Sequence, residues 1–169
     1  LGAIQGLTEF FPVSSSGHLV IAQHFLNITK DVVFLDIFLH IGTVLALLTF
    51  FRKDIVLALK NPKMIGYVAI VTLITGIIGI TFKKTFESLF NSAHDTAIQF
   101  LINGAILLLV PLFKEKKKHL GITESIVMGV AQGTAIIPAI SRSGLTIASL
   151  LAMGVNKEEA FRFSFIASI

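Results

Sequence analysis

The stretch Leu1–Leu26, LGAIQGLTEFFPVSSSGHLVIAQHFL, is apolar toward both ends and polar at its centre. Pro12, followed by serines and a glycine, interrupts the apolar pattern, and neither half is long enough to cross a bilayer. Ile122–Gly154 has the same character and is broken by Pro138 and a second Ser/Gly cluster. Each stretch is therefore predicted to form a hairpin of two half-helices that enters the membrane, breaks at depth and returns.

The two broken stretches are related by an internal repeat. A shift that carries position 14 onto position 141 aligns them without a gap. The residues that match are Gly2 with Gly129, Gln5 with Gln132, Gly6 with Gly133, Ser14 with Ser141, Ser16 with Ser143, and Gly17 with Gly144. Matches in one register on both sides of each break indicate a repeated hairpin rather than a chance similarity.

Three stretches between the hairpins are apolar enough to cross a bilayer: Phe34–Phe51, Met64–Phe82 and Ala97–Phe113. At about 1.5 Å per residue each covers roughly 27 Å, close to the thickness of the hydrocarbon layer. Residues 157–169 are predicted to begin a further helix. The predicted fold is an all-α integral membrane protein, a single membrane domain over residues 1–169 with transmembrane helices and two re-entrant broken-helix hairpins.

The composition agrees with a membrane protein, because 54% of the residues are hydrophobic and only 14% are charged, too few to cover a soluble domain. The 14 Lys and Arg exceed the 10 Asp and Glu, but this excess falls in short loops, so no nucleic-acid partner is expected. Segments Arg52–Lys63 and Lys114–His119 each carry four basic residues against one acidic residue, whereas Asn27–Asp36 and Lys83–Thr96 carry no net positive charge. The positive-inside rule places the first two in the cytoplasm and the last two outside.

This orientation makes the first hairpin enter from outside and the second from the cytoplasm, so the repeat is predicted to be inverted. In such folds the broken helices meet near the middle of the membrane and form the site. Half-helices that start near Gly17 and Gly144 would direct the positive ends of their dipoles at the shared centre, beside serine hydroxyls. That arrangement suits a phosphate. The alternative is that the serines cap or pack the helices.

Several polar side chains within the hairpins are candidates for chemistry, because ionisable groups at bilayer depth are costly. Gln5 and Glu9 lie one helical turn apart, and Glu9 suits a divalent cation or a general base. His18 is a candidate proton shuttle, whereas His40 is interpreted as a structural hydrogen-bonding residue. Arg142 suits bidentate contact with phosphate oxygens, and the alternative is an ion pair with Glu9.

Two runs resemble known signatures. Gln5–His18, QGLTEFFPVSSSGH, resembles the first signature of the undecaprenyl-diphosphatase family, also called the bacitracin-resistance family. Pro138–Thr146, PAISRSGLT, is similar to its second signature, except that Ala139 stands where the family usually has glycine. The resemblance covers the whole chain in the right order, and members of the family continue through further membrane helices.

The resemblance implies hydrolysis of undecaprenyl (polyprenyl) diphosphate to the monophosphate, which recycles the lipid carrier for cell-wall synthesis and gives bacitracin resistance. It also implies a site open to the outer face of the bacterial plasma membrane and a requirement for Mg²⁺ or Ca²⁺. The alternative function is a broken-helix transporter or flippase of a phosphorylated lipid. The expected partners are the lipid substrate and the bilayer, and the sequence leaves open a homo-oligomer.

The expected division of labour combines the resemblance with the chemistry of the residues. The expected catalytic residues are Glu9, Ser15, His18 and Arg142; the phosphate-binding residues are Ser14, Ser16, Ser141, Arg142, Ser143 and Thr146; and the metal ligands are Gln5 and Glu9. Ser15, His18 and a water molecule remain alternative nucleophiles.

Overall fold

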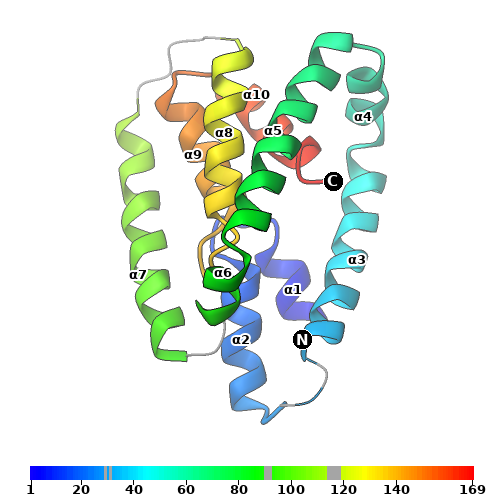
Figure 1. Ribbon diagram of the computed structural model, residues 1–169. Helices are drawn as coiled ribbons and strands as arrows, with labels where there is room; N and C mark the ends of the chain where they lie inside the picture. Colours follow the sequence, from blue (N-terminus) through cyan, green and yellow to red (C-terminus); the bar gives the residue numbers. More distant parts are fainter. Residues whose placement is uncertain (29, 31, 90–92, 114–118) are drawn as a thin grey trace.

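Every regular element in the described part of the chain is a helix (Figure 1). The computed structural model describes residues 1–28, 30, 32–89, 93–113 and 119–169. The helices are α1 (Gly2–Thr8), α2 (Ser15–Phe25), α3 (Val32–Phe50), α4 (Arg52–Leu59), α5 (Pro62–Thr81), α6 (Lys83–Leu89), α7 (Ala93–Leu109), the 3-10 turn η1 (Val110–Leu112), α8 (Ile122–Thr134), α9 (Arg142–Ala152) and α10 (Lys157–Ile166). The all-α membrane fold predicted from the sequence is therefore confirmed. The basic run at 114–118 lies outside the described residues.

Among the residues that the structure describes, two helices are long and apolar enough to cross a membrane, Pro62–Thr81 and His94–Leu112. They correspond to the predicted spans 64–82 and 97–113. Only 6% of the apolar window of α5 is buried, and Ile80 and Leu101 are 81% and 76% exposed. Apolar side chains directed away from the protein need a hydrocarbon solvent, so these faces are the lipid-facing surface.

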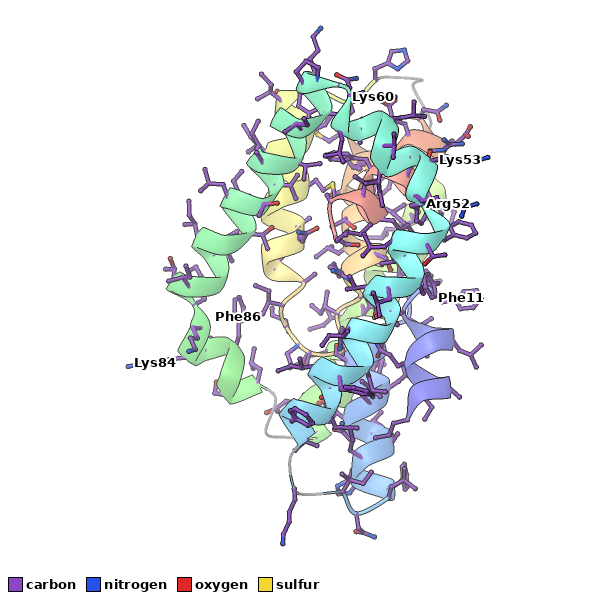
Figure 2. All side chains as sticks on the ribbon, turned by 90° about the vertical axis from the view of Figure 1, so that its right-hand side faces the viewer. Phe11, Arg52, Lys53, Lys60, Lys84 and Phe86 are labelled. Atoms are coloured by element: carbon purple, nitrogen blue, oxygen red, sulfur yellow. The ribbon has the colours of Figure 1, made fainter. Side chains whose placement is uncertain are left out.

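The third predicted span bends sharply at its end. Phe34–Phe50 and Arg52–Leu59 pass the same test only as a pair, bent by 74° at Phe51. The segment expected to be a loop, Arg52–Lys63, therefore contains helix α4, and the loop expected at 83–96 likewise contains α6. No residue of α4 is buried, and the bend keeps its charged first turn out of the apolar span. Figure 2 shows Arg52, Lys53 and Lys60 together at this end of the molecule and Lys84 lower down.

The densest helix contact joins α5 to α8 and depends on small residues. A Cβ atom added to Gly129 would lie 3.2 Å from the Cα of Val71, and one added to Gly133 would lie 2.7 Å from the Ile78 side chain. The Thr75 hydroxyl also donates to the Gly129 carbonyl at 3.3 Å. Glycines that let two backbones approach in this way are typical of packed membrane helices.

The two broken hairpins are α1 with α2 and α8 with α9. The chain leaves helical geometry between Thr8 and Ser15 and again between Thr134 and Arg142, as the sequence predicts. Figure 1 shows α2 (blue) running from mid-height toward the lower end and α9 (orange) running from mid-height toward the upper end. The hairpins therefore open toward opposite ends, and their breaks lie at the same height. The predicted inverted repeat also requires that a single symmetry operation relates the two complete hairpins, and that part stays a prediction.

Candidate active site

The first break ends in a serine cap. The Ser14 hydroxyl accepts a hydrogen bond from the Gly17 amide at 3.4 Å and pairs with the Ser16 hydroxyl at 3.2 Å. Ser14 has a φ of 64°, a left-handed conformation that turns the chain into α2. Because the capping bond satisfies only one of the first amides, the other N–H groups of the first turn remain without an acceptor inside the helix.

The second break ends in the same arrangement. The Ser141 hydroxyl accepts from the Gly144 amide at 3.1 Å and pairs with the Ser143 hydroxyl at 3.3 Å. The repeat thus reproduces the capping bonds as well as the residue types. Ser14 and Ser141 are N-caps, the alternative that the sequence left open. The half-helices begin at Ser15 and Arg142, each two residues before the glycine near which its start was expected.

Reciprocal packing of two glycines holds the breaks together. A Cβ added to Gly17 would lie 2.8 Å from the Cα of Ala139, in the second break. A Cβ added to Gly144 would lie 3.1 Å from the Cβ of Pro12, in the first break. Ala139 has a φ of 58°, in the left-handed region that favours glycine, which explains why the resembled family usually has glycine there.

This packing predicts that Gly17→Ala destabilises the protein. The added methyl would overlap the Ala139 backbone and approach the Phe100 ring to 2.6 Å, and overpacking of this kind costs about 1–3 kcal/mol. We expect a lower melting temperature in detergent. The matched control is Gly104→Ala, because a Cβ at Gly104 meets nothing within 4 Å. Equal melting temperatures for the two variants would contradict the close approach of the breaks.

An ion pair joins the two hairpins at the breaks. An Arg142 Nη2 donates to Glu9 Oε1 at 2.7 Å, and Nη1 donates to the Ser168 carbonyl at 3.1 Å. The other Glu9 oxygen, Oε2, accepts from Gln5 Nε2 at 3.1 Å and from the Ser15 hydroxyl in a short hydrogen bond. Glu9 is 8% exposed and Arg142 is 36% exposed, so the guanidinium retains an accessible edge. This is the geometry of a hydroxyl nucleophile bonded to a carboxylate base, with a fixed cation beside it.

These groups line a cavity of about 1420 Å³ between the hairpins and α3. At the breaks its polar lining includes Glu9, Ser14, Ser15, Ser16, Ser141, Arg142 and Ser143, and its apolar wall includes Ile37, Ile41, Val44, Leu45, Ile136 and Ile140. The structure therefore brings together serines from both signatures with Glu9 and Arg142. A cavity with a polar cluster at the breaks and many apolar side chains in its wall suits an amphipathic ligand.

Three of the predicted site residues do not line this cavity. His18 donates from Nδ1 to the Ser14 carbonyl at 2.7 Å, and its ring packs edge-on against Phe100. Thr146 is fully buried, and its hydroxyl bonds to the Arg142 carbonyl at 2.7 Å and to the Ser164 hydroxyl at 2.6 Å. Gln5 is 1% exposed and lies behind Glu9. The structure places these three around the site rather than within it.

Sequence reasoning missed a second polar group in the cavity wall. Gln23 Nε2 donates to Asp36 Oδ1 at 2.6 Å, and His40 Nδ1 donates to the Asp36 carbonyl at 2.7 Å. The hydrogen bond expected for His40 is thus present, yet its ring also lines the cavity. The available signal was the spacing of Asp36 and His40, which puts two polar residues on one face of an apolar helix.

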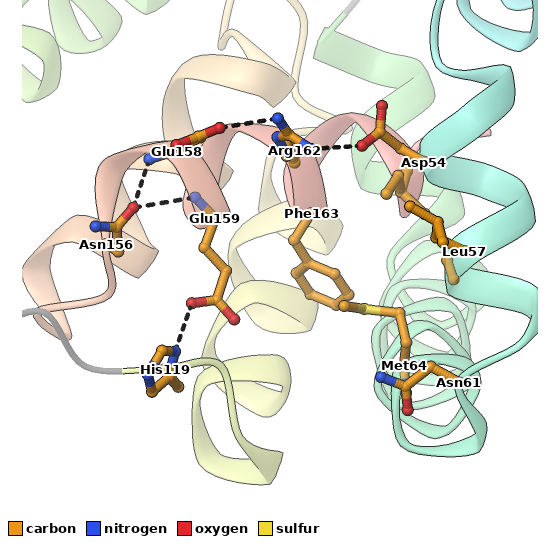
Figure 3. A pocket seen from close by; sticks show the side chains of 12 residues that line it. Asp54, Leu57, Asn61, Met64, His119, Asn156, Glu158, Glu159, Arg162 and Phe163 are labelled. Carbon is orange, nitrogen blue, oxygen red and sulfur yellow. Dashed lines mark hydrogen bonds and ion pairs between the residues drawn. The ribbon is translucent and has the colours of Figure 1, made fainter.

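A smaller cavity of about 620 Å³ lies beside α4 and α10, away from the breaks (Figure 3). Arg162 joins Asp54 at 2.6 Å and Glu158 at 2.8 Å, and Glu159 accepts from the Leu120 amide. Each carboxylate here already has a partner, and no hydroxyl side chain is among the described residues that line this cavity. We therefore assign the chemistry to the larger cavity.

The fold and the larger cavity define a class: an α-helical membrane protein with a polar site at the meeting point of two broken hairpins. A family model described as bacitracin resistance protein BacA matches residues 1–169, and the chain belongs to this family. It is 46% identical to an undecaprenyl-diphosphatase of Carboxydothermus hydrogenoformans over 100% of this chain and 67% of that protein. It is 43% identical to the enzyme of the same name from Halothermothrix orenii, over 99% and 68%, and 40% identical to that of Methanobrevibacter smithii, over 100% and 70%.

Proposed function

We propose that this protein is a membrane phosphatase that hydrolyses undecaprenyl diphosphate to undecaprenyl phosphate and inorganic phosphate. The observation that carries the proposal is the contact of the Ser15 hydroxyl with Glu9, beside Arg142 and between two serine-capped helix N-termini. The relatives are named as diphosphatases, which favours this function over transport of a phosphorylated lipid. The expected partner is a polyprenyl diphosphate lipid whose chain lies against the apolar wall of the cavity.

The geometry supports attack by Ser15. As its Oγ forms a bond to the terminal phosphorus, its proton passes to Glu9 Oε2, and the bridging P–O bond breaks with its electron pair left on the lipid monophosphate. A water molecule then attacks the phosphoserine, and the Oγ–P bond breaks with its electron pair left on Ser15 Oγ. Glu9 returns its proton to Oγ, and the protons of the water leave with the inorganic phosphate. His18 is a weaker candidate nucleophile, because its Nδ1 is bonded to the Ser14 carbonyl and its ring lies outside the cavity.

Arg142 and the two helix N-termini act on the charge of the phosphates. Arg142 keeps donors free beyond those bonded to Glu9 and Ser168, so it can contact phosphate oxygens without leaving Glu9. Each helix N-terminus adds roughly half a positive charge. Arg142 and the two helix N-termini together supply about two positive charges, and Glu9 offsets about one of them. The remaining positive charge does not neutralise a diphosphate, which favours an additional cation.

We therefore propose that Glu9 holds Mg²⁺ or Ca²⁺ together with the phosphates, and that Gln5, which does not line the cavity, would be a ligand from the buried side of Glu9. Gln5 Oε1 is a buried oxygen that has no hydrogen-bond partner in the described part of the chain, and it belongs to the amide that contacts Glu9. Among the described residues, no three His, Asp or Glu side chains form a metal site by themselves, so phosphate and water oxygens would complete the coordination. The ion would neutralise charge on the phosphates in the transition state.

Phosphate release from undecaprenyl diphosphate by the purified full-length protein tests both proposals. We expect turnover in the presence of Mg²⁺ or Ca²⁺, a loss of about tenfold or more after chelation, and recovery when the ion is restored. Lipid translocation without phosphate release would support the transporter instead. Full turnover in chelator would leave the phosphatase proposal standing and remove the metal.

We also propose that the protein lies in a bacterial plasma membrane, with the first hairpin and α6 on the outer side. The chain contains no cysteine, so single cysteines can be introduced without background. Lys84→Cys should react with an impermeant thiol reagent on intact cells, and Lys60→Cys should react only after lysis. Both residues are exposed and lie at different ends of α5 (Figure 2). The reverse labelling pattern would invert the orientation.

A further inference from the structure

Helix α7 contacts both breaks through one face. Phe100, Asn103 and Leu107 are spaced three and four residues apart, which places them on one side of the helix. A Cβ added to Gly17, at the start of α2, would lie 2.6 Å from the Phe100 ring. A Cβ added to Gly144, at the start of α9, would lie 3.1 Å from Leu107. The residue between these two contacts is Asn103.

Asn103 bonds to the backbone of both breaks. Its Nδ2 donates to the Pro12 carbonyl at 3.4 Å, and its Oδ1 accepts from the Ser141 amide at 3.0 Å. Asn103 is 4% exposed and Ser141 is 2% exposed, so water is not an alternative partner. Backbone groups outside a helix must find partners at membrane depth, and Asn103 supplies one to each hairpin.

We infer that Asn103 is a positioning residue, which fixes the spacing between the Ser14 and Ser141 caps and therefore the geometry of the phosphate site. This inference rests on the proposed function. Ser14 and Ser141 belong to hairpins that are far apart in the sequence. The Glu9–Arg142 ion pair joins these hairpins only through side chains. The amide of Asn103 joins their backbones, so it sets where Ser15 lies relative to Arg142.

Misplacing a catalytic group lowers kcat more than it weakens substrate binding, because a misplacement of about 1 Å can lower turnover by roughly 100-fold. Asn103→Leu keeps a similar size but removes both hydrogen bonds. We expect kcat to fall by about tenfold or more while KM changes by less than about threefold. Asn103→Asp keeps the acceptor for the Ser141 amide and should retain an intermediate kcat.

The matched control is Gln99→Leu, one turn earlier on the same helix. Gln99 is 6% exposed, and its Oε1 is a buried oxygen without a hydrogen-bond partner among the described residues. The kcat of the Gln99→Leu variant should remain within about twofold of the kcat of the parent protein. A residue that only stabilises the fold would lower the melting temperature and the yield but leave kcat of the folded fraction unchanged.

The experiment measures kcat, KM and melting temperature for the full-length parent protein and the three variants, with undecaprenyl diphosphate as the substrate. An unchanged kcat in folded Asn103→Leu would overturn the inference. If Asn103→Leu does not fold, Asn103→Asp decides, and an unchanged kcat there overturns it. A parent protein that releases no phosphate would instead refute the proposed function.

Discussion

Arg142→Lys should lower turnover by about 100-fold or more, with little change in folding. The guanidinium contacts Glu9 through Nη2 and the Ser168 carbonyl through Nη1, and its remaining donors are available to the cavity. Lysine keeps the positive charge and can still pair with Glu9, but it cannot hold these partners and a phosphate in one plane. Steady-state phosphate release and the melting temperature together separate the two effects.

Arg162→Lys is the matched control for this substitution. Arg162 also bridges two partners, Asp54 and Glu158, but it does so beside the smaller cavity. The Arg162→Lys substitution makes the same chemical change far from the breaks, so turnover should stay within about twofold of the parent value. Near-parental turnover in Arg142→Lys would show that Arg142 serves only as the partner of Glu9.

Ser15→Ala should lower turnover by roughly a thousandfold or more while the protein still binds the lipid diphosphate. Without the hydroxyl, the site keeps Arg142, both helix N-termini and the apolar wall, so binding and electrostatic stabilisation remain. Phosphate release measures the loss, and acid quenching of the parent protein should trap phosphate on Ser15.

Ser16→Ala is the control, because the Ser16 hydroxyl bonds to Ser14 rather than to Glu9. It should lose less turnover than Ser15→Ala. If Ser15→Ala keeps near-normal turnover, the covalent route is wrong, and Glu9 would then activate a water molecule directly.

Much of this protein follows from the sequence because membrane insertion depends on local properties. The spans in α5 and α7, the breaks at the two Pro/Ser/Gly clusters and the register of the repeat are all visible in short windows of residues. The same holds for Glu9, Ser15 and Arg142, because a charge or hydroxyl cluster within an apolar hairpin is conspicuous.

The tertiary structure decided which of these residues meet. Sequence reasoning grouped His18 with the site, but its ring packs against Phe100 and does not line the cavity. It treated Asp36 and His40 as a loop residue and a structural residue, although the packing of α3 places both in the cavity wall. It also missed the 74° bend at Phe51, which separates α4 from the span.

Asn103 shows the physical reason most clearly. In the sequence it is one of two polar residues in the apolar span Ala97–Phe113, with Gln99, and its neighbours along the chain give it no partner. Its two partners, Pro12 and Ser141, are 91 and 38 residues away and come together only when the hairpins meet. The apolar pattern and its Pro/Ser/Gly interruptions determined that two broken hairpins would form, whereas contacts between distant residues determined how their breaks form one site.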